Sequence, residues 1–326
     1  MVPHEGTGLA LRVLVTGASG FIGRNLIAAC PRDWEVLALY RAATDFPVYA
    51  ASLGEHVRAL RCDLTDAVAV ARVGPSAAGK FDVVFHLAGR VAIPRSLTDP
   101  AGDLFDNALA TAQLVRTVEA GHLVYLSTGA VYEGQIGRAD ARLSLRPSLP
   151  YSAHKVLGEL YARAAVERFG TAPRVSIVRF FGAYGPYEPA HKLYARLVRR
   201  FAIEREPDID VYGAGTNLID AMWISDACAG LLRIGQDDRA DRDAIWTVDF
   251  AQGRPLAIDD VVRLACRVLL DREATIRHSG TSAESNAFFG DTGPLQRALG
   301  IRPQTSLENG LPRYAEWWRR RAGTPG

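Results

Sequence analysis

Short apolar runs rich in Val, Leu and Ile alternate along the chain with longer segments whose apolar residues recur at helical spacing. The runs show little polar alternation, which is typical of strands that are covered on both faces. Strands that alternate with helical segments predict an α/β fold of Rossmann type, with a doubly wound parallel sheet. The strands that we predict in this way are residues 11–16, 35–40, 56–62, 82–88, 122–128 and 174–180.

The pattern changes after residue 181. A Pro/Gly loop, "YGPYEPA", precedes a helix near 191–204, and the remaining chain mixes helices with short strands. We therefore predict a dinucleotide-binding domain made of residues 1–181 and 217–250. Residues 182–216 and 251–326 are expected to form a smaller mixed α/β C-terminal substrate lobe, interleaved with the first domain in one structural unit.

Composition narrows the class of partner. The 326 residues are 48% hydrophobic, enough to bury a large core, and the net charge of +2 gives no excess that favours nucleic acid or a membrane surface. No apolar run approaches the roughly 18 residues of a membrane span. The four cysteines are scattered without metal-ligand spacing. These features predict a cytoplasmic protein that binds small molecules and holds no metal.

A glycine-rich turn follows the first predicted strand. In "VLVTGASGFIGRNLIAA", Gly17 allows a tight turn, Gly20 lets the backbone approach a pyrophosphate, and Gly23 permits close packing of the next helix. The amino end of that helix attracts the anion. The motif therefore predicts a bound dinucleotide.

The end of the second predicted strand bears on the choice of dinucleotide. A carboxylate at this place would bind the ribose 2′-hydroxyl of NAD, but the chain has Tyr40 and Arg41. Arg41 could pair with a 2′-phosphate. We therefore predict NADP as the preferred cofactor. NAD is the alternative if Arg41 is a surface residue or stacks on adenine.

Tyr151 and Lys155 stand four residues apart in a helix predicted to run to about residue 168, so they share one face. A nearby cation lowers the pKa of a phenol, and a compact ammonium can also bind a ribose hydroxyl. Ser127 and Thr128 end the fifth strand, where a hydroxyl can hold a reacting oxygen. This set predicts proton transfer coupled to hydride transfer.

Over nearly the whole chain these motifs resemble the extended short-chain dehydrogenase/reductase family of nucleotide-sugar epimerases, dehydratases and reductases. The resemblance is carried by "TGASGFIG", "CDLTD", "FHLAG", "NALATAQLV", "STGAVYE", "PYSAHK", "RFFGAYGP" and "LGIRPQTSLENGL". The candidate cofactor-binding residues are Gly17, Ser19, Gly20, Phe21, Ile22, Gly23, Arg41, Asp63, Leu64, Leu87, Ala88, Gly89, Asn107, Ser127, Tyr151, Lys155 and Phe181.

The resemblance also implies roles. Tyr151 would exchange a proton with the C4 oxygen of a sugar, Thr128 would share that hydrogen bond, and Lys155 would lower the tyrosine pKa and hold the nicotinamide ribose. The family further implies a homodimer through a four-helix bundle of the helices near 103–119 and 151–168. The candidate substrate-binding residues are Arg90, Thr128, Gly129, Gly182 and Lys192.

The chain departs from the family pattern at the substrate. Gly129 and Ala130 stand where 4,6-dehydratases have Asp-Glu, so we expect no 4,6-dehydration. Ile219 replaces an arginine that meets the diphosphate, and "SNAFFGD" lacks a second one, which removes charge-assisted bonds. Either Lys192, Arg196 or Arg142 takes over the diphosphate, or the substrate is not nucleotide-linked.

These observations lead to one expected function and two alternatives. We expect an NAD(P)-dependent oxidoreductase that transfers hydride at C4 of a nucleotide-activated deoxysugar, with 4-keto reduction favoured. The alternatives are an NAD-dependent nucleotide-sugar 4-epimerase and a non-catalytic dinucleotide sensor. The intact set Thr128, Tyr151 and Lys155 argues against the sensor. His154 is expected on the surface of its helix.

Overall fold

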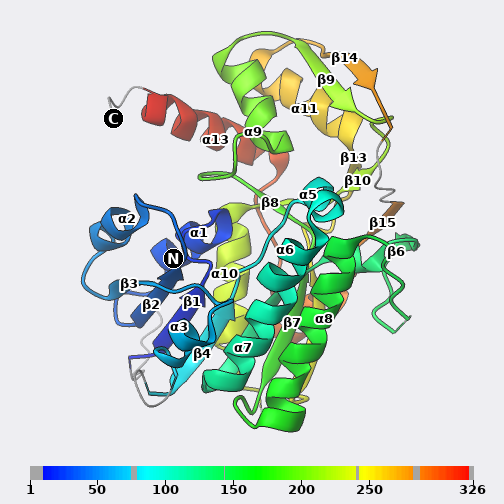
Figure 1. The fold of residues 1–326 in the computed structure, drawn as a ribbon. Coiled ribbons are helices and arrows are strands. Elements are labelled where there is room, and N and C mark those ends of the chain that lie inside the picture. The colour runs from blue at the N-terminus through cyan, green and yellow to red at the C-terminus, as the bar shows by residue number, and fades with distance from the viewer. Residues whose placement is uncertain (1–9, 75–78, 143, 240–241, 282–286, 323–326) are drawn as a thin grey trace. The chain divides into compact units, whose positions relative to one another are not determined.

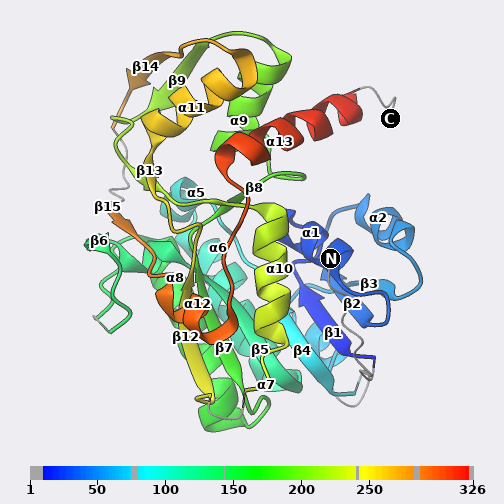
Figure 2. The ribbon, with the colours of Figure 1, turned by 180° about the vertical axis from the view of Figure 1, so that it is seen from behind.

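The protein is built around a seven-stranded sheet with the strand order β12-β7-β5-β4-β1-β2-β3 (Figure 1). The computed structural model describes residues 10–74, 79–142, 144–239, 242–281 and 287–322. Figure 2 shows the strands from behind, from β12 at one edge to β3 at the other. The strands are β1 (Arg12–Thr16), β2 (Glu35–Tyr40), β3 (Val57–Arg61), β4 (Phe81–His86), β5 (Ala120–Thr128), β7 (Val175–Phe180) and β12 (Ile245–Phe250).

The strand pairs confirm the predicted doubly wound topology. β1 pairs in parallel with both β2 and β4, and Val13 lies opposite Val36 on one side and Val83 on the other. β2 pairs in parallel with β3, and β4 with β5. The chain therefore winds outward from β1 in both directions, and the carboxyl ends of β1 and β4 form the switch point where such folds bind ligands.

The predicted strands agree with the structure to within two residues at each end. Their apolar runs are buried on both faces: Val13, Leu14 and Val15 have no exposed surface, and all of β7 is buried. β12 was not predicted as a strand of this sheet. Its sequence IWTVDF carries Thr247 and Asp249 among apolar residues, which obscured the pattern.

The chain divides into two units. The first comprises Met1–Leu126, His154–Ile177 and Ile234–Trp246, and the second Ser127–Ala153, Val178–Arg233 and Thr247–Gly326. The boundaries pass through β5 and through α8 (Pro150–Ala164). The domain boundaries inferred from the sequence stay a prediction.

In the first unit, α7 and α8 lie side by side (Figure 1). Its core includes Leu14, Leu39, Val84, Leu123 and Ile177 from the strands. α6, η1 and α7 follow one another without a break from residue 100 to 117. Besides α8, its helices are α1 (Phe21–Ala29), α2 (Phe46–Ser52), α3 (Ala67–Ala71), α5 (Ile93–Thr98), α6 (Pro100–Leu104), η1 (Phe105–Leu109), α7 (Ala110–Thr117) and η3 (Ala165–Phe169).

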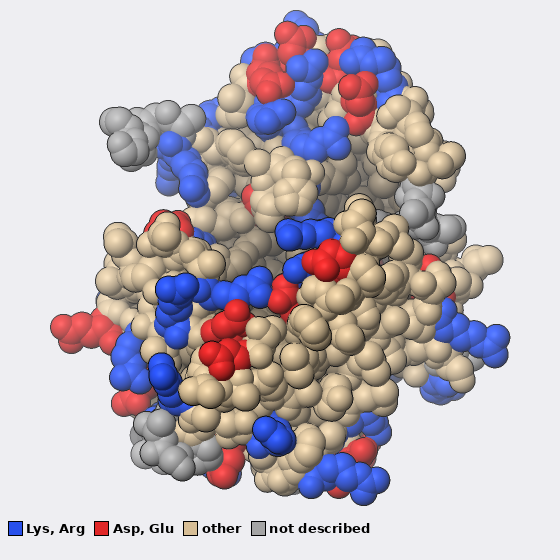
Figure 3. Space-filling model, in the orientation of Figure 1, with Lys and Arg blue, Asp and Glu red and all other residues tan. Residues whose placement is uncertain are grey.

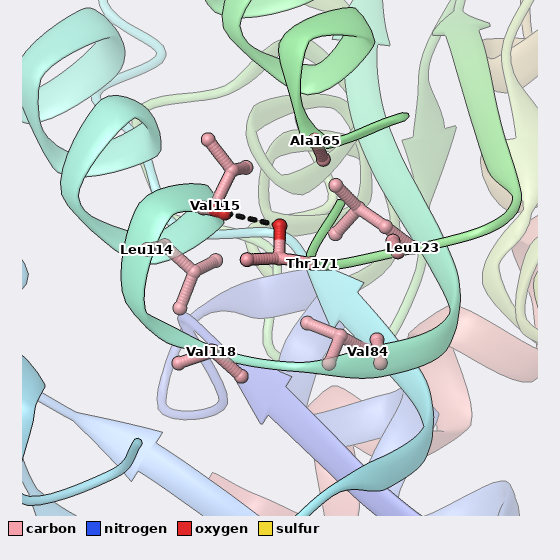
Figure 4. Close-up of a pocket in the computed structure, with 9 residues that line it drawn as sticks. Val84, Leu114, Val115, Val118, Leu123, Ala165 and Thr171 are labelled. Carbon is pink, nitrogen blue, oxygen red and sulfur yellow. Dashed lines mark hydrogen bonds between the residues drawn. The ribbon is translucent and has the colours of Figure 1, made fainter. Parts of the chain in front are cut away.

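A small void lies inside this core, beside Leu114, Val118 and Val84 (Figure 4). Its volume is about 10 Å³, and a polar group at its wall, the Thr171 hydroxyl, already donates to the Val115 carbonyl oxygen. A void of this size holds at most about one water molecule. It is a packing gap rather than a ligand site.

The second unit contains short strands and longer helices. β9 pairs in parallel with β14, β8 with β11 and β6 with β15, whereas β10 and β13 are antiparallel. Its strands outside the main sheet are β6 (Ile136–Arg138), β8 (Ala183–Tyr184), β9 (Asp208–Tyr212), β10 (Leu218–Ile219), β11 (Met222–Trp223), β13 (Leu256–Ala257), β14 (Thr275–Ser279) and β15 (Ala287–Phe289).

The helix predicted near 191–204 is present as α9 followed by η4. α11 is amphipathic and buries Val261, Val262, Ala265 and Cys266. Within the described ranges, no helix combines the length and the apolar character needed to cross a membrane. The helices of this unit are η2 (Gly129–Tyr132), α9 (Leu193–Val198), η4 (Arg199–Ile203), most of α10 (Ile224–Gly235), α11 (Ile258–Leu270), α12 (Gly293–Leu299) and α13 (Leu307–Ala322).

Candidate active site

The glycine-rich turn between β1 and α1 is shaped for a phosphate. Gly17 has φ +65, and a Cβ at this residue would lie 2.8 Å from the Ala88 backbone. A Cβ at Gly23 would lie 2.3 Å from the Gly17 carbonyl oxygen. α1 begins after Gly20, and no side chain caps its first amides. Those amides are available to an anion, so the turn fits the pyrophosphate of a dinucleotide.

The loops after β1 and β4 come together where Gly17 lies against the backbone of Leu87 and Ala88, two of the candidate cofactor-binding residues. The Ala88 amide donates to Thr16 Oγ1 at 3.1 Å. Thr16 Oγ1 lies 2.7 Å from His86 Nδ1, and His86 Nε2 lies 2.9 Å from Thr111 Oγ1. Burial, with a smaller effect of the Lys155 charge, lowers the His86 pKa to about 3, so this histidine is neutral.

Sequence reasoning missed Thr16, His86 and Thr111 as parts of the site. Their side chains are at most 1% exposed. The signal was present in the sequence, because polar residues inside otherwise apolar strands or on the buried face of a helix need partners. The Thr111 hydroxyl donates to the Asn107 carbonyl oxygen at 2.6 Å, which ties these three residues to a predicted cofactor-binding residue.

Asn107 lies in η1 beside Gly89. Its Nδ2 donates to the Arg90 carbonyl oxygen at 3.1 Å, whereas its buried Oδ1 has no hydrogen-bond partner in the described part of the chain. A Cβ at Gly89 would lie 2.5 Å from this Oδ1 and 4.0 Å from Lys155 Nζ. The structure thus brings together Gly89, Asn107 and Lys155, and leaves an acceptor there that a ligand could use.

Lys155 is 6% exposed although it carries a charge. Its Nζ donates to the Leu126 carbonyl oxygen at 2.7 Å and lies 4.4 Å from the centroid of the Tyr125 ring. Burial lowers its pKa to about 8, and the negative charges of Glu159 and Asp103 oppose that shift. The ammonium is therefore still the main form at neutral pH.

Tyr151 lies in the first turn of α8 and is 7% exposed. Because it precedes Lys155 by four residues on the same continuous helix, the two side chains leave one helix face, as predicted. Tyr151 belongs to the second unit, as do Ser127 and Thr128 at the carboxyl end of β5. The Thr128 Oγ1 accepts from the Ala130 amide at 3.2 Å and so caps η2.

Gly129 and Gly182 have structural reasons to be glycine. A Cβ at Gly129 would lie 2.8 Å from the Phe181 ring, and Gly182 has φ +127. Phe181 packs with Tyr132 and Phe288, with ring centroids 6.2 and 6.3 Å apart. These aromatic contacts position the segment after Thr128 in the second unit.

Arg41 does not stand alone at the end of β2. Its Nη1 donates to Asp106 Oδ1 at 2.6 Å, and its Nη2 to Asp106 Oδ2 at 3.4 Å. Arg90, predicted to bind substrate, donates to the same Asp106 at 3.1 Å and to Asp99 at 2.6 Å. Asp63 is held by its own turn, where Oδ1 accepts from the Thr65 amide at 2.9 Å.

One further expectation changed. His154 is not on the helix surface: its Nδ1 lies 2.8 Å from Oδ2 of the fully buried Asp103, and its side chain is only 14% exposed. Lys192 immediately precedes α9. Burial raises the pKa of Glu188 to about 8, and the positive charge of Lys192 opposes that rise. In "SNAFFGD", Ser285 and Asn286 lie outside the described residues.

Comparison with known proteins supports the fold class and changes the functional picture. dTDP-glucose 4,6-dehydratase of Mycolicibacterium smegmatis (strain ATCC 700084 / mc(2)155) is 28% identical over 95% of this chain and 93% of its own length. The structure of MoeE5 in complex with UDP-glucose and NAD is 27% identical, with a TM-score of 0.82, over 96% of this chain and 100% of that chain. TunA, an NAD dependent-NDP-hexosamine 5,6-dehydratase, is 28% identical, with a TM-score of 0.79, over 95% and 98%.

These comparisons contradict the function expected from the sequence. The prediction that the protein does not catalyse 4,6-dehydration is wrong, because relatives that match along almost the whole chain are named as dehydratases. The error was to treat Gly129 and Ala130 as decisive. Two residues that cannot transfer a proton show only that an acid and a base are not at these two positions. The prediction of net 4-keto reduction, which depended on that exclusion, is contradicted as well.

The family itself is not in doubt. The model of the NAD dependent epimerase/dehydratase family matches residues 13–248, which include nearly all of the sheet, the glycine-rich turn and the segment from Thr128 to Lys155. The chain belongs to the NAD dependent epimerase/dehydratase family and is an NAD-dependent enzyme of the extended short-chain dehydrogenase/reductase type.

Proposed function

We propose that the enzyme catalyses a redox-neutral conversion of a nucleotide-linked sugar that starts with oxidation of the C4 hydroxyl. The observation that carries this proposal is the placement of Tyr151 and Lys155 on one face of α8, with Lys155 buried and mainly cationic at neutral pH. The family is described by two kinds of enzyme, epimerases and dehydratases. Neither conversion consumes nicotinamide overall, so we propose a reaction with no net redox change.

In this proposal Tyr151 moves the proton. Its phenolate would take the proton of the C4 hydroxyl while the C4 hydrogen leaves as hydride, and the Thr128 hydroxyl would hydrogen-bond to the same oxygen. The Lys155 ammonium favours the phenolate through its charge. NAD, when bound, supplies the acceptor for that hydride.

The residues of the first unit support a bound dinucleotide. The uncapped amides of α1 and the turn at Gly17 suit a pyrophosphate, and the unpaired Asn107 Oδ1 beside Lys155 Nζ suits a polar group of the ligand. Asp63 and Leu64, which follow β3, are proposed to line the adenine side. Lys155 is proposed to bind the nicotinamide ribose.

We propose NAD rather than NADP as the cofactor. MoeE5 was determined with NAD, and TunA is named as NAD dependent. The NADP preference that Arg41 suggested has no support from these relatives. In the structure both terminal nitrogens of Arg41 are engaged by Asp106, so the group expected to bind a 2′-phosphate already has an anionic partner.

For the substrate we propose a sugar linked to a nucleoside diphosphate, as in the complex of MoeE5 with UDP-glucose. Arg90 is a weaker candidate for its diphosphate than the sequence suggested, because Asp99 and Asp106 already bind its guanidinium. Lys192 remains the proposed basic contact, together with backbone at Gly129 and Gly182.

We also propose a homodimer through α6, η1 and α8. These helices expose large apolar side chains in the first unit, and Figure 3 shows few charged side chains over this part of the surface. The exposed residues are Leu104, Phe105, Leu109, Leu157, Leu160 and Tyr161. Apolar patches of this kind mark protein interfaces.

The proposed reaction is tested by incubating the enzyme with dTDP-glucose, UDP-glucose and UDP-glucuronic acid, without reduced cofactor, and analysing the products by NMR. We expect conversion of one of them with no net change in nicotinamide absorbance. Tyr151→Phe should lose at least about 10²-fold in rate, the contribution typical of acid–base catalysis. Formation of NADH in step with product, or a conversion that requires added NADH or NADPH, would contradict the proposal.

A further inference from the structure

The end of β2 carries a pair of charges that sequence reasoning could not see. Arg41 follows β2 directly, at the place where dinucleotide-binding folds distinguish a ribose 2′-hydroxyl from a 2′-phosphate. Its guanidinium donates to both carboxylate oxygens of Asp106, in η1, at 2.6 and 3.4 Å. A two-point pair of this kind uses the edge of the guanidinium that would otherwise bind a phosphate.

Asp106 is held in place from its other side. Arg90 Nε donates to Asp106 Oδ2 at 3.1 Å, and Arg90 Nη1 donates to Asp99 Oδ2 at 2.6 Å. The Asp106 side chain is 11% exposed, whereas that of Arg41 is 55% exposed. The carboxylate is therefore fixed by two guanidinium groups and largely shielded from water, while Arg41 still reaches the surface.

The charges around Arg41 do not favour a second anion. Arg41, Arg90, Asp99 and Asp106 carry two positive and two negative charges, so this set is formally neutral. The Asp63 carboxylate adds a negative charge that acts on Arg41. A 2′-phosphate, with a charge of about −1.5 to −2 at pH 7, would have to displace Asp106 from Arg41 while two carboxylates repel it.

A ribose 2′-hydroxyl meets no such obstacle. It is uncharged, and it can donate to a carboxylate oxygen that still has lone pairs while it accepts from an exposed guanidinium N–H. The pair of Arg41 and Asp106 can thus do what a single carboxylate at the end of β2 does in other NAD-binding proteins.

We propose that Asp106 is a specificity-determining residue that makes the enzyme select NAD against NADP by occupying Arg41. The carboxylate comes from a helix 65 residues further along the chain rather than from β2 itself. This inference concerns binding of the dinucleotide and does not depend on which sugar the enzyme converts.

The test measures dissociation constants for NADH and NADPH by calorimetry, so it needs no turnover and can succeed or fail independently of the proposed reaction. We expect the wild-type protein to bind NADH at least about tenfold more tightly than NADPH. Asp106→Asn keeps the shape of the side chain and removes its charge. It should tighten NADPH binding about tenfold, the contribution of one charge-assisted hydrogen bond. NADH binding should weaken by less than about tenfold, because the 2′-hydroxyl exchanges a carboxylate acceptor for a neutral amide oxygen.

Two further variants serve as controls. Asp99→Asn removes the same charge from the far end of the set but leaves Arg41 paired with Asp106, so it should leave the NADH/NADPH ratio within about threefold of wild type. The double variant Arg41→Ala/Asp106→Asn should lose the gain in NADPH affinity, because the gain requires Arg41.

Arg41→Ala tests the same idea in a protein that keeps Asp106 paired with Arg90. If Asp106 occupies Arg41 in the wild-type protein, this variant binds NADPH about as weakly as wild type does. A wild-type preference for NADPH would overturn the proposal. So would a tenfold loss of NADPH affinity in Arg41→Ala, or equal effects of Asp99→Asn and Asp106→Asn on the ratio.

Discussion

Tyr132 donates a hydrogen bond of 2.7 Å to Asp249, and both side chains are almost fully buried in the second unit. Arg179 Nη1 donates to the same hydroxyl at 2.9 Å. Burial raises the pKa of Asp249 to about 6, and the hydrogen bond from Tyr132 opposes that rise. Tyr132, three residues after Gly129, thus links the buried Arg179 cation to the buried Asp249 carboxyl.

Removing that hydroxyl should destabilise the protein strongly. Tyr132→Phe leaves Arg179 and Asp249 without their shared partner, and we expect the free energy of unfolding to fall by about 2–4 kcal/mol. Urea denaturation at pH 7 measures this. Tyr212→Phe, at a residue that is 64% exposed, is the matched control and should change stability by less than about 0.5 kcal/mol. Equal losses in the two variants would refute the structural role of Tyr132.

The lowered pKa of Lys155 predicts how the stability of the protein changes with pH. Its pKa is lowered from 10.5 to about 8 in the folded protein, so between these values the unfolded chain binds more protons than the folded one. Stability contributed at this residue therefore rises as the pH increases from about 8 to 10.5. Relative to Lys155→Met, which cannot titrate, the wild-type protein should gain free energy of unfolding across this range.

The measurement is the difference in unfolding free energy between the two proteins at several pH values. Lys80→Met, at an exposed residue, controls for the loss of one positive charge elsewhere. A difference between wild type and Lys155→Met that stays constant from pH 8 to 10.5 would show that burial does not shift the lysine in this way.

Two substitutions in the glycine-rich turn separate its effect on protein stability from its effect on NAD binding. Gly17→Ala places a Cβ 2.8 Å from the Ala88 backbone at φ +65, and we expect it to cost about 1–3 kcal/mol of stability. In Gly20→Ala the new Cβ would lie 3.2 Å from the Gly17 carbonyl oxygen, and φ is −77°, so the loss of stability should be smaller than in Gly17→Ala.

Both variants should nevertheless weaken NAD binding by more than about tenfold, because Gly20 stands where a pyrophosphate approaches the backbone. Thermal unfolding and calorimetric titration with NAD give the two readouts. Normal NAD affinity in Gly20→Ala would mean that the pyrophosphate does not lie against this turn.

The proposed dimer is tested on α8. Leu160 is 56% exposed on this helix, and Leu160→Glu should convert a dimer into a monomer in light scattering after size exclusion, because a buried unpaired carboxylate costs several kcal/mol. Val48→Glu changes an apolar residue that is 75% exposed on α2 and should leave the assembly intact. Loss of the dimer in both variants, or in neither, would argue against an interface on α8.

The features that local pattern encodes were predictable. The runs that became β1 to β5 and β7 are apolar because both faces of the sheet are covered, and Gly17, Gly20 and Gly23 follow the first strand at a spacing that has a steric reason. The i, i+4 spacing of Tyr151 and Lys155 likewise needs only the geometry of a helix.

The features that depend on distant pairing were not predictable. Arg41 was read as free because its partner Asp106 is 65 residues away, and His154 as a surface residue because Asp103 is 51 residues away. The prediction of the substrate chemistry was wrong for another reason. Gly129 and Ala130 show which proton donors are missing, and no local pattern shows whether another group takes their place.

The contacts around His86 allow only one order of hydrogens. The chain of bonds starts with the Ala88 N–H, which can only donate, and ends at the Asn107 carbonyl, which can only accept. Thr111 donates its one hydroxyl hydrogen to Asn107, so it must accept from Nε2 of His86. Because His86 is neutral, its Nδ1 then carries no hydrogen and accepts from Thr16. A second proton, on Nδ1, would reverse the bond to Thr16 and leave the Thr16 hydroxyl hydrogen without an acceptor among these contacts. The neutral Nε2–H tautomer is thus the form that satisfies all four bonds, from the Ala88 amide in the loop facing the glycine turn to the Asn107 carbonyl in η1.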